Sequence, residues 1–153
     1  MMEIVFICLL AAVAAVDWKT MEIPDELNLL LFITGVISWI LVPELTAVSR
    51  LLGMISVSVP MFLLTLVVPG AFGGGDIKLM AACGVFLGWK RSLTAAFLAI
   101  VSGGIYGSCL LITRKKGRHD YFAFGPFLCL GMVIALFWGE TIAEWYLKLC
   151  GWS

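Results

Sequence analysis

The sequence predicts an all-α membrane protein, a polytopic bundle of about six transmembrane helices with both termini outside. Of its 153 residues, 62% are apolar and only 13% are charged, and the mean hydropathy is +1.08. An average soluble domain is about 45–50% apolar and about 25% charged. The ten basic and ten acidic residues give a net charge of zero. This composition excludes a soluble globular domain, a disordered chain and a protein that binds nucleic acid through positive charge.

Six apolar segments reach or approach the length of about 17–25 residues with which a helix crosses a bilayer. They are residues 1–16, 27–42, 51–68, 79–89, 92–113 and 127–146. The first is short but extends through Trp18. An acid, Glu3, stands where a signal peptide would carry positive charge, so we expect a retained helix. The second follows Pro24, which suits the first position of a helix.

The remaining segments differ in how clearly they span. Residues 79–89 are too few to cross a bilayer alone, residues 92–113 form the clearest span, and the last segment is interrupted by Gly139-Glu140. Because the six segments use the whole sequence, we expect residues 1–153 to form a single domain within the lipid bilayer.

The distribution of basic residues predicts the topology. With six spans, the loops after the first, third and fifth segments share one face, and their cations are Lys19, Lys78, Arg114, Lys115, Lys116 and Arg118. The opposite face holds Arg50, Lys90, Arg91 and Lys148. Positive charge in short loops stays on the cytoplasmic side. We therefore expect the three odd-numbered loops to be cytoplasmic and both termini to lie outside.

The first of these inner loops contains an acid that local structure does not explain. Asp25 and Glu26 fall in the first turn of the second helix, where the helix dipole favours acidic residues. Asp17 instead ends an apolar run, with no basic residue one helical turn before it. An ionisable residue at that depth is costly, and by default it indicates a functional site.

The second inner loop carries three consecutive glycines directly before an acid, Asp76. Gly73, Gly74 and Gly75 permit a close backbone approach and positive φ angles. Two other interpretations are a flexible hairpin with Asp76 as an ordinary N-cap, and an anion-binding loop. A carboxylate at the helix start would repel phosphate, and the Gly-Lys-Ser/Thr ending of a phosphate-binding loop is missing.

Asp17 and Asp76 are expected on the same membrane face, and together they suggest a mechanism. Two carboxylates held close share one proton, because like charges resist double ionisation. Such a pair can cleave a peptide bond: the ionised carboxylate takes a proton from water while the protonated one polarises the carbonyl. Which of the two holds the proton is a property of the pair.

A metal site is the alternative use of two acids, but no His or third inward acid supports it, so we expect no metal and no cofactor. The five cysteines are scattered without a CxxC pair, so neither a zinc site nor a disulfide framework is indicated.

The third inner loop ends in an aromatic stretch, residues 121–127. Gly125-Pro126 before an apolar run is typical of a turn that leads into a helix, and the aromatic residues could line an apolar groove for an extended peptide. His119 and Asp120 lie beside this stretch in a basic loop, and we expect neither to be catalytic.

These residues resemble the type IV prepilin peptidases, membrane aspartic proteases of the GxGD class. The similarity consists of Asp17 followed by IPDELN at 23–28, GGGDIKLMAA at 73–82, GVFLG at 84–88 and FGPF at 124–127. GxGD alone is weakly specific, because presenilin-like proteases share it, but the combination is specific and covers nearly the whole chain.

The resemblance implies that Asp17 and Asp76 are the catalytic pair, and that the structural motif residues are Pro24, Gly73, Gly75, Gly125 and Pro126. The implied substrate is a pilin-like precursor with a basic leader and an apolar helix. The leader would be cleaved, typically just after a glycine, at the cytoplasmic face of the plasma membrane. Larger family members carry a methyltransferase part with paired CxxC motifs; these motifs are absent here, so we do not expect N-methylation.

We also expect charged residues near the pair to take part in substrate binding. Glu22, Asp25 and Glu26 are candidates for contact with the basic leader. Lys78, two residues after Asp76, could stabilise the ionised carboxylate, or could extend toward the membrane interface. Two alternative functions stay open: intramembrane cleavage of other substrates by a GxGD protease, and a small proton or ion transporter or assembly scaffold.

Overall fold

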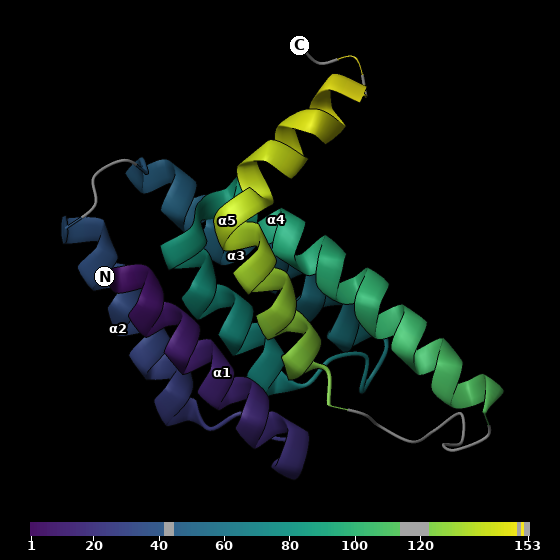
Figure 1. The fold of residues 1–153 in the computed structure, drawn as a ribbon. Helices are drawn as coiled ribbons and strands as arrows, with labels where there is room; N and C mark the ends of the chain where they lie inside the picture. The colour runs from purple at the N-terminus through teal and green to yellow at the C-terminus, as the bar shows by residue number, and fades with distance from the viewer. Residues whose placement is uncertain (42–44, 114–122, 150, 152–153) are drawn as a thin grey trace.

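The computed structural model describes residues 1–41, 45–113, 123–149 and 151. Within these residues it is all-helical and contains no strand (Figure 1). The helices are α1 (Met2–Thr20), α2 (Asp25–Leu41), α3 (Ala47–Val67), α4 (Gly74–Ile112) and α5 (Gly125–Leu149). The basic block at 114–118, and with it His119 and Asp120, lies outside the described residues.

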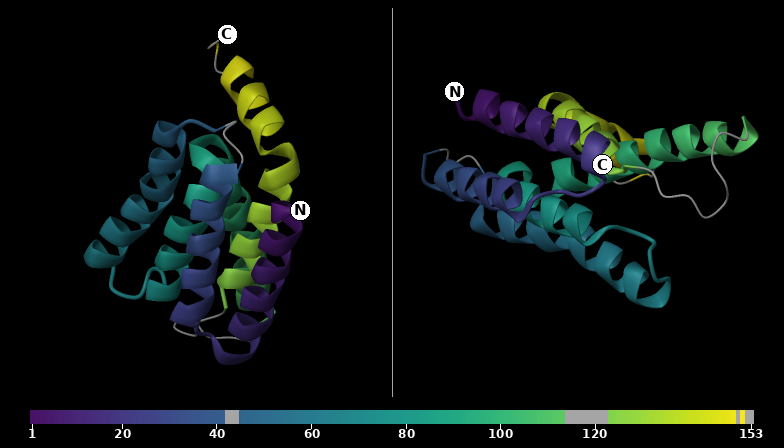
Figure 2. Two further views of the ribbon diagram at one scale, coloured as in Figure 1. Left: turned by 90° about the vertical axis from the view of Figure 1, so that its left-hand side faces the viewer. Right: turned by 90° about the horizontal axis from the view of Figure 1, so that it is seen from below.

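Helix α4 is the centre of the bundle. It contacts α2, α3 and α5, and α1 packs on α2 and α5. The first part of α4 runs among the other helices, whereas its second part and the end of α5 extend away from them (Figures 1 and 2). The α1–α2 connection, the α3–α4 connection and the start of α5 all lie at one end of the bundle (Figure 1). We call this the site end.

The expected segments 79–89 and 92–113 are the two arms of α4. The helix changes direction at Gly88, whose backbone is non-helical with φ 74° and ψ 171°. This region is open essentially to glycine only, so one residue turns the chain and no loop is needed. The expected loop with Lys90 and Arg91 is therefore replaced by helix, and Arg91 pairs with Glu140 of α5 at 3.2 Å. Helix α5 is continuous through Gly139, and this ion pair compensates the charge of Glu140 within it.

Helix α3 begins earlier than expected, because Thr46 caps it by accepting a hydrogen bond from the Ser49 N–H at 3.2 Å. Arg50 therefore lies in the first turn of α3 rather than in a loop, and it is fully buried. Its guanidinium donates to the Val85 carbonyl at 3.0 Å and to Ser38 at 3.4 Å. A cation expected at the opposite face thus joins α2, α3 and α4 inside the bundle.

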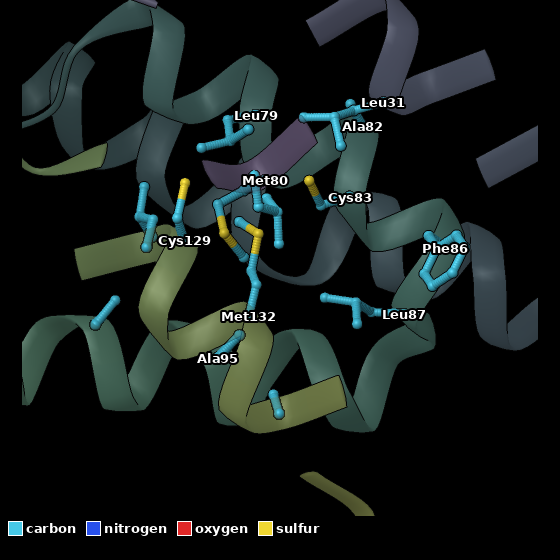
Figure 3. Packing of buried hydrophobic residues seen from close by; sticks show 14 of the residues in the cluster. Leu31, Leu79, Met80, Ala82, Cys83, Phe86, Leu87, Ala95, Cys129 and Met132 are labelled. Carbon is cyan, nitrogen blue, oxygen red and sulfur yellow. The ribbon is translucent and has the colours of Figure 1, made fainter. Parts of the chain in front are cut away.

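Apolar side chains from all the helices form the core. On α1 they are Phe6, Leu10 and Val13, spaced to share one helix face. Phe6 stacks on Phe86 of α4, with ring centroids 4.2 Å apart. Side chains of α4 and α5 meet in the interior (Figure 3), among them Leu79, Met80, Cys83, Cys129 and Met132.

Helices α3 and α4 cross with almost no space between their backbones. A Cβ on Gly53 would overlap the carbonyl oxygen of Gly84, and a Cβ on Gly84 would overlap that of Gly53. Small residues at such crossings let helices approach closely, as is common in membranes. This crossing fixes the first arm of α4 against α3.

Three helices of the described part are long and apolar enough to cross a membrane: α3, residues Gly74–Leu110 of α4, and α5. Large apolar side chains are also exposed along α2 and α3, with Ile40 77% and Val67 79% exposed. Exposed apolar surface of this kind marks contact with lipid or another apolar partner. The chain is a membrane protein.

Candidate active site

Asp17 lies near the end of α1 and is only 4% exposed. Its Oδ2 accepts a hydrogen bond from the backbone N–H of Gly125 at 3.0 Å. Gly125 is the first residue of α5, and the first N–H groups of a helix have no partner within it. A Cβ on Gly125 would lie 2.6 Å from the same oxygen, so the start of α5 approaches Asp17 at a distance that only glycine allows.

Asp76 is the third residue of α4 rather than its N-cap, and it is 8% exposed. A Cβ on Gly73 would lie 3.2 Å from Asp76 Oδ2, and a Cβ on Gly75 would lie 3.0 Å from Ile23. Here the glycine run serves close approach; the positive φ in this loop occurs earlier, at Gly70 (φ 84°).

The two carboxylates meet at the site end. Both line one cavity of about 280 Å³, whose walls are Asp17, Met21, Glu22, Ile23, Asp25, Gly73, Gly74, Gly75 and Asp76. A cavity lined by two buried carboxylates has the elements of general acid–base chemistry on a bound water.

Only some of the charged residues expected to bind substrate line the cavity. Glu22 and Asp25 line the cavity, whereas Glu26 is exposed on the first turn of α2 and is not part of its wall. Lys78 forms an ion pair with Asp25, with Nζ 2.8 and 2.9 Å from the two carboxylate oxygens. The cation expected to act on Asp76 is therefore directed at Asp25.

Both prolines of the predicted motif lie at helix starts. Pro24 directly precedes α2, one residue before its expected place, and its carbonyl accepts hydrogen bonds from the N–H groups of Leu27 and Asn28. Pro126 is the second residue of α5, where its missing N–H costs nothing. Pro126 thus supports the helix start that presents the Gly125 N–H to Asp17.

Aromatic side chains surround this end of the bundle. Phe72 packs on Phe124, with ring centroids 5.7 Å apart. Tyr106 packs on Phe127 at 5.2 Å and on Trp18 at 6.4 Å. The sequence pointed to residues 121–127 for an aromatic lining, but it gave no sign of Tyr106 or Phe72, which come from other segments. Residues 121 and 122 lie outside the described part.

Within the part of the chain that the structure describes, the cysteines do not gather into a metal site. Cys83 and Cys129 are buried free thiols, while Cys8 and Cys109 are exposed. Among the described residues, no group of three or more His, Cys, Asp and Glu side chains could hold a metal ion.

Fold and cavity together define a helical membrane protein with a pair of buried carboxylates at one end. Residues 4–108 match the model of the Type IV leader peptidase family. A prepilin leader peptidase/N-methyltransferase of Bacillus subtilis is 31% identical over 147 residues, which cover 95% of this chain and 59% of that protein. Proteins of the same description from Aeromonas salmonicida and Xanthomonas campestris are 33% and 29% identical, over 91% and 97% of this chain and 50% and 53% of theirs. No solved structure shows significant similarity.

The chain belongs to the Type IV leader peptidase family. This membership confirms the resemblance drawn from the sequence motifs. The chain spans about half the length of the curated relatives it matches.

Proposed function

We propose that this protein is a membrane aspartic endopeptidase that removes the basic leader from type IV pilin-like precursors. The observation that carries the proposal is the meeting of Asp17 and Asp76, both buried, in one cavity of a family member. The site faces the cytoplasm in this proposal, and the enzyme is a multi-pass protein of the plasma membrane.

The two carboxylates act on one water molecule. The ionised member of the pair takes a proton from water as the oxygen attacks the scissile carbonyl, and the protonated member donates a hydrogen bond to the carbonyl oxygen. The shared proton belongs to the pair. The N–H of Gly125 fixes the orientation of Asp17 within this pair.

The cavity wall suits a substrate with a basic leader. Glu22 offers a carboxylate at the cavity, and Glu26 lies exposed on the adjoining turn of α2. Both attract the positively charged leader, while the apolar helix of the precursor lies in the bilayer against the exposed apolar faces. Asp25, the third acid of this region, already holds Lys78.

Co-expression with a pilin-like precursor tests the proposal. Asp17→Asn and Asp76→Asn, each alone, are expected to leave the precursor at full length on a gel while the enzyme is still found in the membrane fraction. Glu140→Gln, a change in an acid outside the cavity, serves as the matched control and is expected to process normally. Leader removal by either Asp variant would refute the assigned pair. Ion flux in liposomes without any proteolysis would favour a transporter instead.

A further inference from the structure

An ion pair between Lys78 and Asp25 joins the N-terminal part of α4 to the first residue of α2. Lys78 Nζ lies 2.8 and 2.9 Å from the two oxygens of Asp25, so the pair is bidentate on the carboxylate. The two side chains are 59% and 70% exposed. Exposed ion pairs add little to folding stability, so stability does not account for this geometry.

The pair lies next to Asp76 on the same helical turn. Ile23 is buried and packs against Gly75, the residue before Asp76. Asp25 holds Lys78, two residues after Asp76. Ile23 and Asp25 therefore contact α4 at residues on either side of Asp76 in the sequence, Ile23 through an apolar contact and Asp25 through an ion pair.

The same connection starts at the other carboxylate. Helix α1 ends at Thr20 and is capped by Met21, which has a left-handed backbone (φ 55°) and whose N–H donates to the carbonyl of Asp17 at 2.8 Å. Only a short stretch of chain separates Asp17 from Asp25. Whatever fixes Asp25 against α4 therefore also limits how far Asp17 and Asp76 can move apart.

We propose that Lys78 and Asp25 are a positioning pair whose ion pair holds the start of α2, and with it the α1–α2 connection, against the N-terminal part of α4, and so sets the separation of Asp17 and Asp76. The inference rests on the proposed peptidase function. In this role Lys78 does not neutralise Asp76 directly, and Asp25 does not contact the leader.

Kinetics with the purified full-length enzyme and a pilin-like precursor test this role. Lys78→Met and Asp25→Asn are each expected to lower kcat about 2- to 5-fold, the most that the loss of an exposed ion pair allows, with KM unchanged. Lys78→Arg keeps the charge and is expected to retain most of the activity. The charge-swapped double variant, Lys78→Asp with Asp25→Lys, is expected to recover kcat relative to either single variant.

Glu140→Gln is the matched control, because it removes a different ion pair, with Arg91, between α4 and α5. Glu140 lies fifteen residues after Gly125 on α5, or about 22 Å along a helix. The kcat of the Glu140→Gln enzyme is therefore expected to stay at the wild-type level. Raised salt, which screens exposed charges, is expected to lower kcat in the wild type more than in Lys78→Met.

Two results would overturn the inference. One is an Asp25→Asn variant with raised KM and unchanged kcat that the charge swap does not rescue, which would place Asp25 on the leader. The other is wild-type kcat in both Lys78→Met and Asp25→Asn. If a single variant does not fold, the kcat of Lys78→Arg and of the charge swap still decide. A wild-type enzyme that leaves the precursor uncut would instead refute the proposed function, and this inference with it.

Discussion

Replacing Gly125 with alanine is expected to slow catalysis by displacing Asp17. The added Cβ would lie 2.6 Å from Asp17 Oδ2 and 2.9 Å from Cγ. Ordinary contacts between carbon and oxygen are about 3.3 Å or longer, so the carboxylate must shift by roughly 0.7 Å. The hydrogen bond from the Gly125 N–H, now 3.0 Å, would then lengthen beyond the normal range of about 2.7–3.2 Å.

The size of the effect follows from this shift. A misplacement of about 1 Å can cost about 100-fold in rate, so we expect kcat to fall roughly 10- to 100-fold. The loss of stability from overpacking is expected to be about 1–3 kcal/mol. The enzyme should therefore fold, and the loss should appear in kcat rather than in the amount of membrane-inserted protein.

The assay is the rate of leader removal from a pilin-like precursor at saturating substrate, with thermal unfolding followed by circular dichroism. Gly104→Ala is the control, because Gly104 lies outside the cavity wall and a Cβ there meets nothing within 4 Å. Its kcat should match the wild type. A folded Gly125→Ala enzyme with wild-type kcat would refute the idea that this glycine is needed for the placement of Asp17.

Two further predictions concern the packing of α4. Gly84→Ala is expected to lower the unfolding temperature strongly, because its Cβ would overlap the backbone of Gly53. Gly104→Ala is the control and should not lower it, because a Cβ there meets nothing within 4 Å. Equal unfolding temperatures for the two variants would contradict the close crossing of α3 and α4. Gly88→Ala is expected to cost about 1–3 kcal/mol from backbone strain alone, with an added overlap at 2.8 Å from Ser49 Oγ. Thermal unfolding of Gly88→Ala with and without Ser49→Ala separates the backbone strain from the overlap with Ser49. A Gly88→Ala variant as stable as wild type would refute both contributions.

The meeting of Asp17 and Asp76 could be predicted because it depends on topology alone. Each acid flanks an apolar segment, and loops after odd-numbered segments share one face of the membrane. The groups that hold the two carboxylates in place could not be predicted in the same way. Gly125-Pro126 has a sufficient local explanation as a turn before a helix, and the N–H that binds Asp17 comes from 108 residues away.

The partner of Lys78 was missed for a related reason. Asp76 is its neighbour in sequence, but two residues along a helix do not face one another. Asp25, 53 residues away, lies opposite Lys78 once α2 packs on α4. Sequence distance therefore pointed to the wrong carboxylate, and only the packing of the helices shows the right one.

The break between segments 79–89 and 92–113 was predicted in the right region but with the wrong structure. Lys90 and Arg91 resembled a polar loop, because hydropathy does not show that a single glycine can turn a helix. The charge of Arg91 is instead compensated within the bundle by Glu140.

The most direct test of the central claim compares Asp17→Asn, Asp76→Asn and the double variant in one cleavage assay with the purified enzyme. Residues that act as a unit lose activity non-additively. Each single variant is expected to fall to the same background rate as the double variant, with all three folded and inserted. A single variant that keeps substantial activity, or a double variant slower by the product of the two single losses, would contradict a paired-carboxylate mechanism.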